Sequence, residues 1–124
     1  MPTQLAVAAG GALGALTRYL VDRSIESRAA GLFPWSTFTI NLSGCFVVVV
    51  LVSALVDRHH TPEWVRLGLV MGVLGGYTTF STFGQETLDL IEEGRLAIAF
   101  TYAVASVAIG VAAVFAGSRL GRVL

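Results

Sequence analysis

Long stretches without a charged side chain alternate with short polar connections along this chain. They cover residues 1–17, 29–56, 67–85 and 96–118. A helix needs roughly 20 apolar residues to cross a bilayer core of about 30 Å, because lipid offers backbone groups no hydrogen-bond partner. Residues 45–52 are apolar on every side and lack the alternation of a lipid-facing strand. The pattern therefore predicts an all-α membrane protein and not a β-barrel.

Helix-start signals and charges place the limits of four transmembrane helices in a single domain, residues 1–124. Proline is tolerated in a first helical turn, so Pro34 is expected to open the second helix. Thr61, Pro62 and Glu63 are typical of an N-cap, a first helical residue and an early acidic residue, and open the third. The predicted spans are residues 4–21, 34–57, 62–93 and 96–119.

The third of these spans is interrupted by glycine and polar residues. Its apolar part, residues 67–76, covers only about 15 Å of helix. The helix is predicted to break near residues 75–78, with Gly75 and Gly76 as the natural place to unwind, and such an interruption indicates an ion or substrate site. Unwinding frees backbone carbonyls at mid-membrane, which need a cation, buried water or a neighbouring helix as a partner.

The composition excludes several classes of protein. Only 13% of residues are charged, about half the usual share, and the net charge is zero without a basic cluster, which argues against a nucleic-acid partner.

No basic stretch precedes the first apolar run, so we expect a retained span and not a cleaved signal. Cys45 has no intrachain partner and is expected to pack in a helix. His59 and His60 have no third ligand nearby, so a metal site there is not expected.

Glycines recur at intervals of four residues. The positions are Gly10 and Gly14, then Gly68, Gly72 and Gly76, and finally Gly117 and Gly121. Such spacing lets the backbones of neighbouring helices touch. It predicts a compact helical bundle that is also oligomeric.

Arginine residues are balanced between the two ends of the predicted bundle. The end that holds both termini carries Arg58, Arg66, Arg119 and Arg122, and the opposite end carries Arg18, Arg23, Arg28 and Arg95. An excess of positive charge on one side sets the orientation of a membrane protein. Equal numbers therefore predict insertion in both orientations, and the two forms are expected to pair as an antiparallel dimer.

Polar residues inside the spans leave more than one interpretation open. The Asn41 amide can donate to a neighbouring helix or to an anion, and Glu86 either guards a pore mouth or lies at the interface. A helix that starts near Thr78 separates hydroxyl and amide groups from phenylalanines: Thr78, Ser81, Thr82 and Gln85 share one face, Phe80 and Phe83 the other. Phenyl ring edges can contact an anion, although two such residues are also common in lipid or core contacts.

Three segments together resemble the Fluc/CrcB family of fluoride channels. They are residues 10–19 (GGALGALTRY), 39–46 (TINLSGCF) and 72–83 (GVLGGYTTFSTF), and the third is the most specific. The resemblance implies a multi-pass protein of the bacterial inner membrane, a dual-topology antiparallel homodimer whose two pores let fluoride leave the cytoplasm passively. Fluoride, a second copy of the chain and the lipid bilayer are thus the expected partners.

The resemblance also assigns roles to individual residues. The family's pore-lining amide and phenylalanines are matched by Asn41, Phe80 and Phe83, and its polar track is matched by Ser81, Thr82 and Glu86. Its vestibule arginine is matched by Arg18. The positions whose backbone carbonyls hold a structural Na⁺ are matched by Gly75 and Thr78. Ser36 and Val49 stand where glycine is expected. We expect these two departures to affect packing and not the pore.

Two other functions are compatible with a small four-helix membrane protein. A proton-coupled multidrug exporter needs a titratable carboxylate in a span, and here only Glu86 lies near one. A non-conducting assembly subunit would need the glycine-rich faces but not residues 78–83. An enzyme is not expected, and no catalytic residues are assigned, because no nucleophile, base and orienting residue occur at a recognisable spacing.

Overall fold

The computed structural model describes residues 1–56 and 60–124, and every regular element in these ranges is a helix. α1 spans Thr3–Glu26, and α2 spans Trp35–Leu51 and continues as the π-helix η1 over Val52–Val56. The predicted end of the second span, residue 57, lies outside the described residues, as do Arg58 and His59. The last helix, α6, spans Leu96–Val123.

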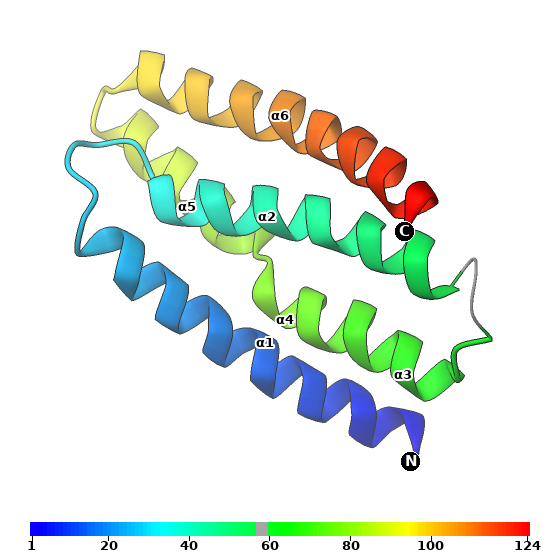
Figure 1. Cartoon of the computed structure of the whole chain (residues 1–124). Coiled ribbons are helices and arrows are strands. Elements are labelled where there is room, and N and C mark those ends of the chain that lie inside the picture. Colours follow the sequence, from blue (N-terminus) through cyan, green and yellow to red (C-terminus); the bar gives the residue numbers. More distant parts are fainter. Residues whose placement is uncertain (57–59) are drawn as a thin grey trace.

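The helical pieces between α2 and α6 form two rods. α3 (Glu63–Leu67), the π-helix η2 (Gly68–Leu74) and α4 (Gly75–Tyr77) follow one another without a gap, and α5 (Phe80–Glu92) comes after two extended residues. Figure 1 shows the joint between α4 and α5 near the middle of the molecule. The two rods together occupy the region expected for a broken third span.

Three helix limits differ from the sequence-based expectation. Pro34 and Pro62 precede α2 and α3 as N-caps and are not first-turn residues. Thr61 does not cap α3, because its hydroxyl donates to the Leu55 carbonyl at the end of the second span. α1 continues to Glu26, beyond residue 21, because the polar residues after the apolar run extend the helix past the predicted span.

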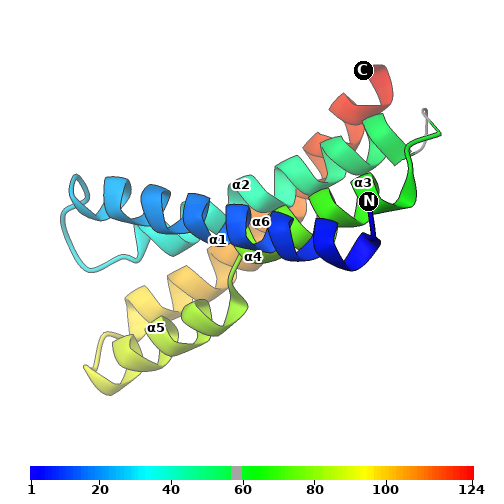
Figure 2. The ribbon, with the colours of Figure 1, turned by 90° about the horizontal axis from the view of Figure 1, so that it is seen from below.

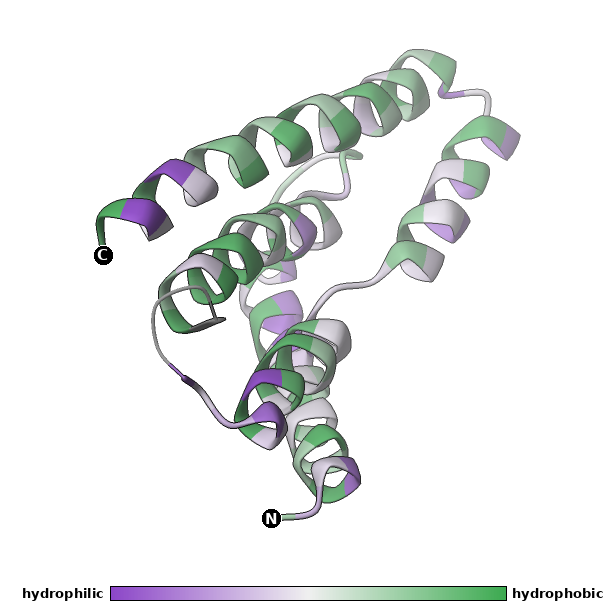
Figure 3. Cartoon of the chain, turned by 90° about the vertical axis from the view of Figure 1, so that its right-hand side faces the viewer, coloured by the Kyte–Doolittle hydropathy of each residue, from purple (hydrophilic) through white to green (hydrophobic). Residues whose placement is uncertain are grey.

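Two helical stretches are long and apolar enough to cross a membrane, residues Trp35–Leu55 and Leu96–Val123. Figure 3 shows hydrophobic residues along the length of these helices and hydrophilic residues gathered toward the ends of the molecule. α1 carries charged residues in its last turns, and the break divides the third span. In the part of the chain that the structure describes, length and composition therefore single out two spans, and the other helices lie alongside them.

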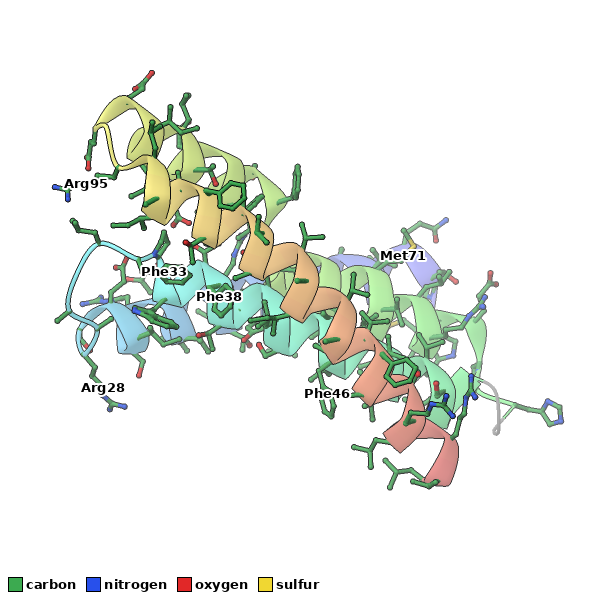
Figure 4. All side chains as sticks on the ribbon, turned by 90° about the horizontal axis from the view of Figure 1, so that it is seen from above. Arg28, Phe33, Phe38, Phe46, Met71 and Arg95 are labelled. Carbon is green, nitrogen blue, oxygen red and sulfur yellow. The ribbon has the colours of Figure 1, made fainter. Side chains whose placement is uncertain are left out.

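Both chain termini lie at one end of the bundle, and the connections α1–α2 and α5–α6 lie at the other (Figure 1). Figure 4 places Arg28 and Arg95 at that second end. Seen from below, α1 and α5 diverge toward it (Figure 2). Tyr102 of α6 is fully buried there, and the rings of Phe33 and Phe83 pack on it with centroids 5.4 and 4.9 Å away.

Glycines allow α1 to touch the first rod of the third span, as their spacing predicts. A Cβ added at Gly14 would lie 2.0 Å from the Val73 carbonyl oxygen, and one at Gly76 would lie 2.6 Å from the Gly11 carbonyl oxygen. Similar clashes would occur at Gly10 and Gly72, and on α6 at Gly117 and Gly121. The predicted close packing of these helices is therefore confirmed.

Replacing Gly14 with alanine is expected to destabilise the fold by about 1–3 kcal/mol or more, because the two backbones must separate to admit the methyl group. A Cβ at Gly11, on the same helix, would meet nothing within 4 Å. Gly11→Ala is thus the matched control. Thermal unfolding in detergent should show a lower midpoint for Gly14→Ala alone, and equal midpoints for the two variants would contradict the packing argument.

Candidate functional site

The third span leaves helical geometry at Thr78 and Thr79, and not at the glycine pair. Thr78 has φ −81° and ψ 157°, and Thr79 has φ −150° and ψ 114°, whereas Gly75 and Gly76 are helical. Gly76 is a glycine because α1 approaches its Cα closely. Gly76 therefore serves helix contact, whereas a Cβ at Gly75 would meet only the Val70 carbonyl oxygen of the same rod, 4.0 Å away. The extended conformation is adopted by two β-branched residues that favour it.

Asn41 of α2 holds the extended backbone at the break. Its Nδ2 donates to the Thr79 carbonyl oxygen at 2.9 Å, and the Thr79 N–H donates to Asn41 Oδ1 at 2.8 Å. The amide thus satisfies a backbone donor and a backbone acceptor that a neighbouring strand would otherwise satisfy. The sequence left two partners open for the Asn41 amide, a neighbouring helix or an anion, and the structure contains the contact with a neighbouring segment. The second N–H of the amide has no partner among the described residues.

The break exposes the carbonyl end of α4. In a continuous helix the Thr79 N–H would bond to the Gly75 carbonyl, but here it bonds to Asn41. Thr78 donates both its N–H and its hydroxyl to the Leu74 carbonyl, each at 3.0 Å. The Gly75 carbonyl therefore loses its helical donor, and carbonyls at a helix end carry the negative end of the helix dipole.

Thr79 also caps α5, the second half of the span. Its Oγ1 accepts a hydrogen bond from the Thr82 N–H at 3.3 Å and donates to Thr82 Oγ1 at 2.9 Å. The Thr82 hydroxyl proton is consequently free to donate elsewhere. Because α5 begins at Phe80, Thr78 does not share a helical face with Ser81 and Thr82, and that projection from the sequence was wrong.

A cavity of about 450 Å³ lies at the break, and we call it the phenylalanine cavity. The predicted site residues that line it are Asn41, Gly75, Thr78, Phe80 and Phe83. The two phenyl rings lie 5.6 Å apart, and Phe80 is 81% exposed. Ser106 of α6 lines the same cavity with a buried hydroxyl oxygen that has no hydrogen-bond partner among the described residues.

A second cavity of about 260 Å³, the arginine cavity, lies between α1, α2 and the start of α5. Its polar lining consists of Arg18, Tyr19, Asp22, Thr37, Thr79 and Thr82. Thr79 lines both cavities and separates them. Two of the predicted residues, Arg18 and Thr82, therefore meet here and not beside the phenylalanines.

Glu86 lines neither cavity and connects three helices. Thr37 of α2 donates to its Oε1 at 2.8 Å, and Tyr102 of α6 donates to its Oε2 at 2.7 Å. Both hydroxyl donors are almost completely buried. Glu86 thus joins α5 to α2 and α6, and its place at a pore mouth or at the membrane interface stays a prediction. Ser81 is exposed, lines neither cavity and has its oxygen 3.5 Å from Thr79 Oγ1.

Three residues that organise this site, Thr37, Thr79 and Tyr102, have no role predicted from the sequence. Thr79 stood in the most specific motif, but its place between two cavities depends on the extended backbone. Thr37 and Tyr102 are ordinary polar residues near span ends, and only their shared contact with Glu86 distinguishes them. Ser36 was expected to affect packing alone, yet its hydroxyl donates to the Asp22 carboxylate.

Comparison with known proteins gives consistent results over nearly the whole chain. Residues 5–118 match the family model described as CrcB-like protein, Camphor Resistance (CrcB). A Nitrobacter hamburgensis protein named fluoride-specific ion channel FluC 1 is 43% identical over 120 residues, 97% of this chain and 95% of its own. The FluC proteins of Agrobacterium fabrum and Geobacter sulfurreducens are 44% and 39% identical, covering 94% and 100% of this chain and 93% and 100% of their own. This chain belongs to the CrcB family.

Proposed function

We propose that the chain is a fluoride-selective channel that lets fluoride leave the bacterial cytoplasm by passive permeation. Its relatives are named fluoride-specific ion channels and not enzymes, and each match covers at least 93% of both chains. The two apolar helices fit a protein of the inner membrane. We place four spans in that membrane, the third of them broken.

The break at Thr78 and Thr79 is the observation that carries this proposal. It brings the carbonyl end of α4 and the N–H end of α5 to one cavity. Helix N-termini favour anions, helix C-termini favour cations, and broken membrane helices use both ends at ion sites. A continuous helix would bury these groups in its own hydrogen bonds.

Fluoride is small and strongly hydrated, so a selective path must replace water with many weak donors. The proposed donors are the ring edges of Phe80 and Phe83, the hydroxyls of Ser81 and Thr82, and the amide N–H of Asn41 that Thr79 does not use. Arg18 is placed at the entrance of the path. Glu86 holds the neighbouring hydroxyls of Thr37 and Tyr102 in position. Each is a weak ligand alone. Weak, multiple contacts let an ion enter and leave.

We further propose a dual-topology antiparallel homodimer with two pores. The equal arginine count of the two ends supports insertion in both orientations. Phe80, which lines the cavity, is 81% exposed in the single chain, and a partner would cover it. Without a partner, the exposed Phe80 ring would face lipid.

The carbonyls of Gly75 and Thr78 are the proposed ligands of a structural Na⁺ at the centre of the dimer. Carbonyl oxygens suit an alkali cation, and the Gly75 carbonyl has lost its helical donor to Asn41. Both residues lie at the negative end of α4 and line the phenylalanine cavity. When bound, the cation would supply positive charge that joins the two subunits near the fluoride path.

Purified protein in liposomes should release fluoride much faster than empty liposomes and faster than it releases chloride. Phe80→Leu should slow this efflux by roughly tenfold or more, since each 1.4 kcal/mol of lost stabilisation at the barrier is a factor of ten. Phe80 is the cleaner test of the two rings because it is exposed, whereas Phe83 also packs on Tyr102.

Phe100→Leu is the matched control, since Phe100 is exposed on α6 and lines neither cavity. It should retain the wild-type rate. Wild-type liposomes that release fluoride no faster than empty ones would refute the channel.

Compartment reporters fused to the C-terminus should give signals on both sides of the membrane, because the arginines are balanced. Adding lysines at one end should shift the signal to a single side. A reporter signal confined to one side in the unmodified chain would exclude the antiparallel dimer.

A further inference from the structure

The arginine cavity holds an acidic group beside its cation. Asp22 lines this cavity together with Arg18, four residues earlier on α1. Residues four apart lie on the same face of a helix, and an arginine and an aspartate at this spacing can form an ion pair. A carboxylate at the entrance of an anion path is unfavourable in itself, so its placement requires an explanation.

The structure keeps the two charges apart. The Asp22 Oδ1 accepts a hydrogen bond from the hydroxyl of Ser36, which lies in the first turn of α2 and is 6% exposed. Among the described residues, no ion pair or side-chain hydrogen bond involves Arg18. The one ion pair that these residues form joins Arg95 to Glu93. The carboxylate thus bonds to α2, and the guanidinium has no side-chain partner within residues 1–56 and 60–124.

We propose that Ser36 is a positioning residue that holds Asp22 away from Arg18 and so keeps the Arg18 guanidinium available to the permeating anion. The inference rests on the proposed channel function. Without the Ser36 hydroxyl, the Asp22 side chain loses its donor and turns to the nearest cation. Pairing with Asp22 neutralises Arg18 and removes the positive charge that concentrates anions in the cavity.

Ser36→Ala should therefore slow fluoride efflux from liposomes by about threefold or more at low ionic strength, where a charged cleft raises the local anion concentration most. The effect should shrink at high ionic strength because salt screens the charges. Ser36→Thr keeps the hydroxyl and should stay near the wild-type rate. Ser36→Gly also removes the hydroxyl but has a different backbone preference, and it should slow efflux to the same rate as Ser36→Ala.

The double variant Ser36→Ala with Asp22→Asn separates positioning from packing. If Asp22 captures Arg18 in the single variant, neutralising Asp22 should restore efflux to the wild-type rate or above. Ser24→Ala, an exposed change on α1 outside both cavities, is the control and should leave the rate unchanged.

A double variant as slow as Ser36→Ala, or a Ser36→Ala rate equal to the wild-type rate, would overturn the inference while the wild-type protein still conducts. Failure of the channel proposal has a different signature, because the wild-type protein itself would then release no fluoride.

Discussion

Asn41→Ala is expected to abolish fluoride efflux and to lower the stability of the folded protein by about 2 kcal/mol or more. The substitution removes both hydrogen bonds that Asn41 makes with the Thr79 backbone. An unpaired donor or acceptor buried away from water costs about 1–3 kcal/mol. With Thr79 unsupported, the extended backbone between the two cavities loses its defined geometry.

The matched control for Asn41 is Cys45→Ala, one turn further along α2. Cys45 lines the same cavity, and none of the hydrogen bonds described for the chain involves it. Efflux and thermal unfolding should be measured on both variants. Asn41→Asp is informative as well, because it keeps an acceptor for the Thr79 N–H but has no donor for the Thr79 carbonyl.

The stability measurement decides between the two roles of Asn41. If its amide serves only as a fluoride ligand, Asn41→Ala will lose efflux and keep the wild-type unfolding midpoint. If it fixes the break, the midpoint falls too, and Asn41→Asp resembles the alanine variant. We expect the second result.

Glu86→Ala should produce the second large loss, again by about 2 kcal/mol or more. Its two oxygens accept hydrogen bonds from Thr37 and Tyr102, which are 3% and 0% exposed. Alanine leaves both buried hydroxyl groups without this acceptor and removes the hydrogen bonds that join α5 to α2 and α6. Thermal unfolding and efflux should both decline.

Glu86→Gln should have an intermediate effect, since it keeps one acceptor oxygen and the other hydroxyl can turn to accept from the amide. Glu92→Ala is the control, because Glu92 is exposed near the end of α5. If Glu86→Ala unfolds at the wild-type temperature, the carboxylate does not support the bundle and its role is confined to the mouth of the pore.

The all-helical architecture follows from the sequence because lipid imposes a simple rule on it. Long charge-free runs without strand-like alternation form helices in a membrane, so residues 29–56 and 96–118 predict α2 with η1 and α6. The glycine spacing likewise predicts the approach of α1 to the third span. The family resemblance could be recognised from motif residues, and the full-length comparison bears it out.

The place and the partners of the break were decided by tertiary contacts. Gly75 and Gly76 are the residues that local preference would unwind, but a contact with α1 requires glycine at Gly76, and the bonds from Asn41 stabilise the extended form at Thr79. The position of the break therefore depends on contacts between residues far apart in the sequence. Local propensity cannot report such an interaction, because its energy comes from a different helix.

The residue pattern alone predicts the helices, their glycine contacts and the residue types available to an anion. Only the tertiary structure assigned those residues to two cavities, with Phe80 and Asn41 in one, Arg18 and Thr82 in the other and Thr79 between them. It also tied Glu86 to two buried hydroxyls and Asp22 to Ser36. Periodicity indicates which face of a helix a residue occupies, whereas a hydrogen bond depends on which helix lies opposite that face.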